Sequence, residues 1–119
     1  MDQRQALVTV AVIDSGGANL GSVVQALNRL GAESLLTRDA VEIERATHVI
    51  LPGVGAAAAA MQALADANLI EPLKRLTQPV LGICLGLQLL FERSDEGDVE
   101  CLGLLPGQVK LLPKQAELR

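Results

Sequence analysis

Apolar residues along the chain fall into short continuous runs that alternate with segments of helical periodicity. Runs of this kind are typical of strands that are buried on both faces of a parallel sheet. Four of them predict strands, at residues 7–13, 34–37, 48–51 and 80–83. The fourth run is therefore expected to form a buried strand, like the first.

Helices are predicted between these strands. Apolar side chains from Leu20 to Leu30 recur at helical spacing, and Gly31 provides a C-terminal stop. Alanine, the strongest helix former, dominates the segment after residue 55. The polar residues 38–46 predict a loop with a brief helical turn. The predicted helices cover residues 20–30, 56–67 and 69–76, and a fourth continues from the last strand towards Phe91.

This alternation predicts an α/β fold with a three-layer, open, mainly parallel sheet and helices on both faces. The pattern changes after residue 98, and residues 102–112 predict turns and a short strand or hairpin. Residues 1–119 contain no repeat or linker and are expected to form a single domain. Ligands of such sheets bind beyond the carboxyl ends of the strands, so the turns that follow the strands should converge there.

Composition narrows the possible functions. Half of the 119 residues are hydrophobic and Phe91 is the single aromatic residue, so the core must be aliphatic. A net charge of -4 without a basic cluster argues against nucleic acid as a partner. No apolar run reaches transmembrane length, and the N-terminus does not resemble a signal peptide, so no membrane association is expected. Two cysteines suggest neither a disulfide framework nor a metal site, and no cofactor is predicted; a cytoplasmic, reducing location fits best.

The chemistry is expected at Cys84, in the sequence Gly-x-Cys-x-Gly at residues 82–86. A strand, a sharp turn and a helix around such a motif have the shape of a nucleophile elbow, with cysteine in place of serine. The two glycines allow strand and helix to pack closely around a strained turn. The N-terminus of the following helix directs free N–H groups towards the sulfur, which favours a thiolate nucleophile.

Three further features accompany the predicted nucleophile. The turn Pro-Gly-Val-Gly at residues 52–55 follows the neighbouring strand, and its backbone N–H groups are candidate donors to an oxyanion. Gln88 lies four residues after Cys84, on the same side of the predicted helix, where its amide could hold a substrate. Glu96 lies in an acidic turn and could pair with an ammonium group. Each also has a plain structural interpretation: residues 52–55 as an ordinary strand–helix turn, Gln88 as a partly solvated helix residue and Glu96 as a solvated loop charge.

Other candidates are weaker. His48 is the single histidine, but it begins a strand and lies on the order of 10 Å from the end where Cys84 is expected. Cys101 has no elbow around it and is interpreted as structural. The turn at residues 16–21 loosely fits a dinucleotide fingerprint but lacks its middle glycine. Asn19 in that turn could cap a helix or touch a partner.

Taken together, these motifs resemble the class I (triad) glutamine amidotransferases. The resemblance rests on Pro-Gly-Val-Gly at 52–55, on Gly-Ile-Cys-Leu-Gly-Leu-Gln-Leu-Leu-Phe at 82–91 and on nearly all of residues 7–113. Within the class, the opening at residues 13–22 and the segment 96–107 are similar to the glutaminase subunits of imidazole glycerol phosphate synthases. Leu87 replaces the methionine usual in that family, a change that conserves volume.

The resemblance implies a reaction and a partner. Cys84 would attack the side-chain amide of glutamine, while backbone N–H groups of Gly53, Val54, Gly55 and Leu85 would stabilise the oxyanion. Gln88 and Glu96 would hold the glutamine, Glu96 through the α-ammonium group. Ammonia would pass to a cyclase subunit, a β/α barrel of histidine biosynthesis, that the turns at Asn19 and at residues 53–55 would face.

The same resemblance places the catalytic histidine and glutamate of the family beyond residue 119, so the domain is expected to be incomplete at its C-terminus. The 119 residues alone are therefore expected to have little glutaminase activity. An incomplete sheet should also leave apolar surface exposed and cause self-association. Two alternatives stay open: a non-catalytic α/β binding module that retains the elbow, and a nucleotide-binding domain.

Overall fold

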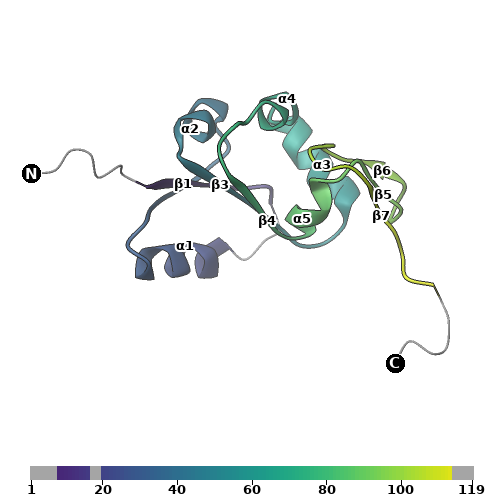
Figure 1. Cartoon of the computed structure of the whole chain (residues 1–119), viewed down its shortest axis with the longest axis horizontal. Coiled ribbons are helices and arrows are strands. Elements are labelled where there is room, and N and C mark those ends of the chain that lie inside the picture. The colour runs from purple at the N-terminus through teal and green to yellow at the C-terminus, as the bar shows by residue number, and fades with distance from the viewer. Residues whose placement is uncertain (1–7, 17–19, 114–119) are drawn as a thin grey trace, which may run out of the picture.

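The computed structural model describes residues 8–16 and 20–113 and confirms the predicted α/β fold (Figure 1). A four-stranded sheet, in the order β2-β1-β3-β4, forms the centre, and every neighbouring pair is parallel. Its strands are β1 (Thr9–Ile13), β2 (Glu33–Thr37), β3 (His48–Gly53) and β4 (Val80–Cys84).

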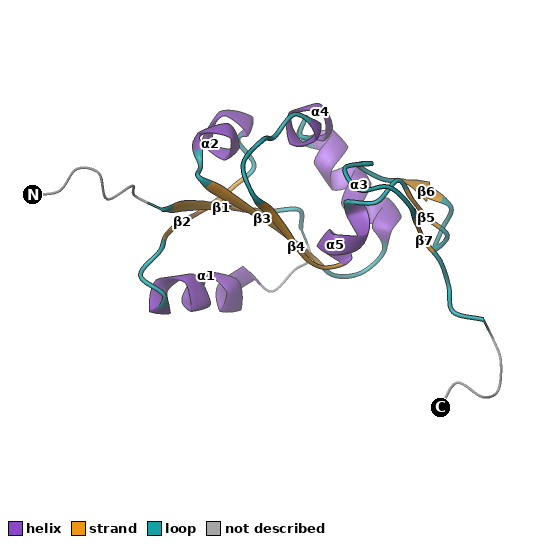
Figure 2. Cartoon of the chain, in the orientation of Figure 1, coloured by secondary structure: helices purple, strands orange, loops and turns teal. Residues whose placement is uncertain are grey.

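Helices cover both faces of this sheet (Figure 2). Alternate residues of a strand point to opposite faces. Val12 and Ile50 therefore pack on one face with α1, whereas Ile13 and Leu51 pack on the other with the remaining helices. The helices are α1 (Leu20–Arg29), α2 (Ala40–Arg45), α3 (Ala57–Asp66), α4 (Ile70–Lys74) and α5 (Leu85–Leu89).

Two helices differ from the prediction. The segment expected to be a loop with a brief helical turn forms the six-residue helix α2, because the Asp39 carboxylate caps the N–H of Val41 at 2.8 Å and Ile43 is fully buried. One apolar anchor in six residues is too sparse a pattern to predict such a helix. In contrast, α5 ends at Leu89 rather than continuing to Phe91.

The prediction that β4 is a buried strand was wrong, since its residues are half-buried or exposed. Among the residues that the structure describes, this strand pairs with β3 alone and forms an edge of the sheet. Leu81, on the face that α1 covers farther along the sheet, remains 57% exposed. Such an edge offers unpaired backbone groups and apolar surface to a second copy of the chain. Self-association therefore stays a prediction, and this edge is where we expect it.

A small second sheet follows α5 and contacts it (Figure 1). It contains β5 (Arg93–Ser94), β6 (Val99–Glu100) and β7 (Gln108–Val109), in the order β6-β5-β7. The prediction of turns and a short strand in residues 102–112 was right, since β7 lies there. The strands β5 and β6 were not predicted, because two residues are too few to show a periodic pattern. Cys101 lies directly after β6, is 4% exposed and belongs to the core, which supports its structural interpretation.

Candidate active site

Cys84 lies at the carboxyl end of β4 and immediately before α5, where its side chain is exposed. Its backbone has φ 55° and ψ −121°, a conformation that residues with a side chain rarely adopt. Backbone strain of this kind costs on the order of 1–3 kcal/mol and persists only where the surrounding structure enforces it. The strand–turn–helix geometry predicted for a nucleophile elbow is therefore present at this cysteine.

The glycines on either side of Cys84 allow the strand and the helix to pack closely around the turn. A Cβ atom on Gly86 would lie 1.8 Å from the carbonyl oxygen of Leu51, and one on Gly82 would lie 2.6 Å from the Cα atom of Leu87. Both distances are far below van der Waals contact, so no side chain fits at either position. The contact at Gly86 also seats the first turn of α5 against β3, beside the turn at residues 53–55.

That turn adjoins the elbow. Gly53 is the residue of β3 in register with Cys84, and a Cβ on it would lie 3.2 Å from the Cβ atom of Leu85. Leu85 opens α5, and the first N–H groups of a helix have no partner within the helix. Val54 is 53% exposed, and Gly55 has φ +92°. The structure thus brings Gly53 and Leu85 together beside Cys84, with Val54 and Gly55 continuing from Gly53.

Ser15 is a residue of this region that the sequence did not single out. It follows β1, is 4% exposed, and its hydroxyl donates to the carbonyl of Pro52 at 3.1 Å. The preceding Asp14 accepts from the N–H of Gly16 at 3.2 Å and pairs with Arg38 at 3.4 Å. A polar residue in a turn is the whole signal in the sequence, and the direction of its side chain could not be inferred from it.

The predicted substrate-binding residues occupy less defined positions. Gln88 is half-buried in α5. Glu96 is exposed in the turn between β5 and β6, where its backbone N–H donates to the Ser94 hydroxyl at 3.2 Å. Neither side chain forms a hydrogen bond with another described residue. Their roles remain predictions. Asn19, predicted at the partner interface, lies outside the described residues.

His48 is far from Cys84. It is the first residue of β3, whereas Gly53, beside Cys84, is the last, and five steps along a strand span roughly 16 Å. Its Nδ1 atom lies 2.8 Å from the hydroxyl of Thr47 at the amino end of the sheet. The prediction that this histidine is structural agrees with its position, which excludes direct contact with the Cys84 sulfur.

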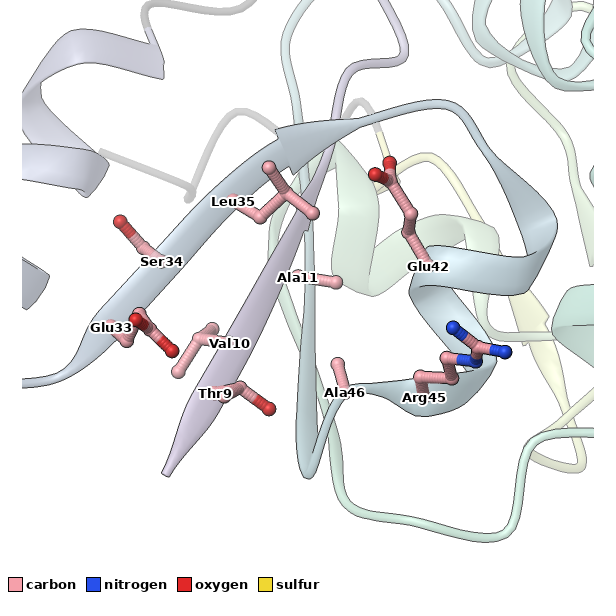
Figure 3. A pocket seen from close by; sticks show the side chains of 9 residues that line it. All are labelled: Thr9, Val10, Ala11, Glu33, Ser34, Leu35, Glu42, Arg45 and Ala46. Atoms are coloured by element: carbon pink, nitrogen blue, oxygen red, sulfur yellow. The ribbon is translucent and has the colours of Figure 1, made fainter. Parts of the chain in front are cut away.

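A hollow of about 440 Å³ lies elsewhere, between β1, β2 and α2 (Figure 3). Leu35 and Ala11 contribute to its apolar wall, and Glu42 and Arg45 come from α2. It shares no residue with the predicted site, and its lining contains the hydroxyls of Thr9 and Ser34 but neither a cysteine nor a histidine. In residues 8–16 and 20–113, no three metal-binding side chains come together, and no helix there is long and apolar enough to cross a membrane.

Comparison with known sequences gives a match to one family. Residues 11–109 match the family described as glutamine amidotransferase class-I. The matched segment contains Cys84, both glycines of its elbow and the turn at residues 53–55.

Individual relatives are similar over most of the chain. Imidazole glycerol phosphate synthase subunit HisH of Xanthomonas axonopodis pv. citri is 62% identical over 104 residues, which cover 87% of this chain and 52% of the relative. The protein of the same name from Xylella fastidiosa (strain Temecula1) is 59% identical over 113 residues, 95% of this chain and 56% of the relative. The chain therefore spans about half the length of these curated relatives.

A solved structure has the same fold. A crystal structure of a glutamine amidotransferase superposes with a TM-score of 0.73 and 22% sequence identity. The match covers 85% of this chain and 55% of that one. At this identity the similarity supports the α/β architecture alone.

Proposed function

This chain belongs to the class-I glutamine amidotransferase family, and we propose that it is the amino-terminal, nucleophile-bearing part of the glutaminase subunit of an imidazole glycerol phosphate synthase. The observation that carries this proposal is the backbone of Cys84. Its positive φ occurs between two glycines that tolerate no side chain, one of which packs against the strand that leads to residues 53–55. A buried structural cysteine needs no such turn.

The proposed reaction begins with attack of the Cys84 sulfur on the side-chain amide carbon of glutamine. The amide oxygen becomes an oxyanion, which accepts hydrogen bonds from the backbone N–H of Leu85 and from the turn of Gly53, Val54 and Gly55. The thiol proton is transferred to the departing nitrogen, which leaves as ammonia, and a thioester remains on Cys84. Water then hydrolyses the thioester to glutamate and restores the thiol.

Gln88 and Glu96 are proposed to hold the substrate. Gln88 lies on the short helix that follows the nucleophile, and its amide has no partner within the described residues. Glu96 lies in the turn between β5, which contacts α5, and β6, and its carboxylate suits the α-ammonium group of glutamine. Both groups must approach the same ligand, so removal of either should weaken glutamine binding more than it lowers the reactivity of the thiol.

The general base is proposed to come from outside these 119 residues. His48 is the single histidine of the chain, and it lies at the opposite end of β3 from Gly53 and Cys84. Without a base, the proton of the thiol has no defined acceptor in the site, and hydrolysis of the thioester is unassisted. We therefore expect covalent chemistry at Cys84 but little or no catalytic release of ammonia.

The partner belongs to the same proposal. A cyclase subunit with a β/α barrel would receive the ammonia and use it in histidine biosynthesis, in a cytoplasmic heterodimer with lyase activity. The turns that contain Asn19 and Gly53–Gly55 would face it, because both follow strands at the carboxyl end of the sheet. The name shared by the relatives, which describes a synthase subunit, supports the existence of such a partner.

The experiment that tests the proposed function is covalent labelling with 6-chloro-5-oxonorleucine, a chloroketone shaped like glutamine. The sulfur adds to the ketone carbon and forms an oxyanion, and it then moves to the neighbouring methylene carbon as chloride leaves and the ketone reforms. The thiol proton passes to water, and a stable thioether remains that mass spectrometry locates. We expect labelling at Cys84, protection by glutamine but not by asparagine, and no labelling of Cys84→Ala. Labelling that glutamine does not slow would favour the alternative of a non-catalytic binding module.

A further inference from the structure

The hydroxyl of Ser15 holds the peptide from which residues 53–55 begin. Ser15 is 4% exposed and donates to the carbonyl oxygen of Pro52 at 3.1 Å, across 37 positions of sequence. Pro52 is itself buried. A buried carbonyl without a hydrogen-bond donor destabilises the folded state by on the order of 1–3 kcal/mol. Orientations of this peptide that keep the bond to Ser15 are therefore favoured.

The position of this hydrogen bond follows from the proline. The paired register of β1 with β3 ends at Val12 and Ile50, and Pro52 has no N–H with which to continue the ladder towards β1. The Ser15 side chain takes the place of the next backbone bond and ties the end of β3 to the turn after β1.

Orientation of one group of this peptide sets the orientation of the other. A trans peptide is planar, so its carbonyl and its N–H point in opposite directions. With the Pro52 carbonyl directed at Ser15, the N–H of Gly53 is directed towards β4, where Gly53 is in register with Cys84. Val54 and Gly55, whose N–H groups are the other proposed donors of this turn, follow directly after this peptide. The ladder of β3 with β4 restrains this peptide on its Gly53 side, and the hydroxyl of Ser15 restrains it on the side of the Pro52 carbonyl.

We propose that Ser15 is a positioning residue for the oxyanion-binding turn, which acts by fixing the Pro52–Gly53 peptide through its hydroxyl. This inference rests on the proposed function, because it assigns Ser15 a role in the same reaction. Ser15 is expected to affect those steps in which negative charge develops on an oxygen. Steps that involve only the sulfur are expected to be independent of it.

Two electrophiles separate these possibilities. The chloroketone 6-chloro-5-oxonorleucine reacts through addition to a carbonyl and so forms an oxyanion, whereas iodoacetamide reacts by direct displacement of iodide at carbon and forms none. The ratio of the two rate constants at Cys84, measured on the 119-residue chain, cancels any change in the fraction of thiolate. Removal of an oxyanion donor lowers catalysis about 10²–10³-fold. For Ser15→Ala, which displaces donors without removing them, we expect the ratio to fall about tenfold.

The chain offers a matched control at the other end of the same two strands. The Thr47 hydroxyl donates to the carbonyl of Thr9 at 2.9 Å and thus also ties β3 to β1. Thr47→Ala should leave the ratio within twofold of the unchanged chain. Ser15→Thr, which keeps the hydroxyl, should retain the ratio, and Ser15→Val, which has the shape of threonine, should lose it. If Ser15→Ala does not fold, the comparison of Ser15→Thr with Ser15→Val still tests whether the hydroxyl positions the turn.

Each result has a defined meaning. An unchanged ratio in Ser15→Ala and Ser15→Val, or an equal loss in both reactions, would overturn the positioning role and leave Ser15 as a structural residue. An equal fall of the ratio in Thr47→Ala would overturn it as well, since strand fraying would then be the cause. If the unchanged chain shows no glutamine-protected labelling, the proposed function itself fails and the role of Ser15 fails with it.

Discussion

At each end of the paired strands β1 and β3, a side-chain hydroxyl donates a hydrogen bond to a backbone carbonyl, but the two bonds differ in burial and in their neighbours. At the amino end, Thr47 bonds to Thr9 at an exposed site, next to His48. At the carboxyl end, Ser15 bonds to Pro52 in a buried site, beside a strained Cys84. Hydrogen bonds alone therefore do not distinguish the predicted site. The positive φ of Cys84 and the close glycine contacts beside it do, because a cysteine rarely adopts such a backbone and keeps it only where the surrounding structure enforces it.

The largest effect is expected from loss of the closest contact at the carboxyl end. Gly86→Ala would place a Cβ atom 1.8 Å from the Leu51 carbonyl oxygen, so β3 and α5 must separate. We expect a loss of about 3 kcal/mol or more in the free energy of unfolding, measured with urea, together with loss of chloroketone labelling. Gly53→Ala is the matched control, since its nearest contact is 3.1 Å and needs a shift of a few tenths of an ångström. Equal stability of the two variants would contradict the account of the elbow.

The two cysteines provide the next comparison. Burial raises the pKa of the Cys101 thiol, an effect that Arg93 partly opposes, whereas Cys84 is exposed. At pH 8, we expect iodoacetamide to modify Cys84 at least tenfold faster than Cys101, as followed by mass spectrometry of Cys84→Ala and Cys101→Ser. Faster reaction at Cys101 would show that the core around it opens readily.

The raised pKa of Cys101 also affects stability, with a defined sign. In the unfolded chain this thiol ionises at a lower pH than in the folded chain, so the folded state binds more protons in the interval between the two pKa values. The contribution of Cys101 to the free energy of unfolding should therefore fall as the pH rises through the unfolded pKa of about 8.5. Cys101→Ser should remove this part of the pH dependence.

Strain at the nucleophile should be measurable as stability. A glycine adopts positive φ without a steric penalty, so Cys84→Gly should be more stable to urea than Cys84→Ala by about 1 kcal/mol. The same pair of substitutions at Asn68, which has φ 58° but lies outside the predicted site, calibrates the effect. A Cys84→Gly variant no more stable than Cys84→Ala would contradict the strained turn.

The smallest effect is expected at the amino end. His48→Ala should leave both labelling rates at Cys84 within twofold, because this histidine lies five strand positions away from Gly53. The expected change in the free energy of unfolding is below about 0.5 kcal/mol, as for most exposed positions. A large fall in labelling with retained stability would show that His48 acts on the sulfur after all.

The same comparison shows what the sequence can predict. Apolar runs and helical spacing located the four strands of the main sheet, and Gly-x-Cys-x-Gly located the elbow, because these features depend on neighbours in the chain. The edge position of β4 and the exposure of Leu81 depend on which strands lie alongside, which periodicity does not encode. The hydrogen bond of Ser15 was missed for the same reason, since its partner is 37 positions away.

The central claim is that the carboxyl end of the sheet provides the nucleophile and its oxyanion turn, whereas the base comes from outside these residues. Release of ammonia from glutamine by the 119-residue chain tests this most directly, with Cys84→Ala as the control and chloroketone labelling as proof of a competent thiol. We predict a labelled Cys84 and no catalytic turnover above the control. Sustained release of ammonia by the chain alone, abolished in Cys84→Ala, would contradict the claim.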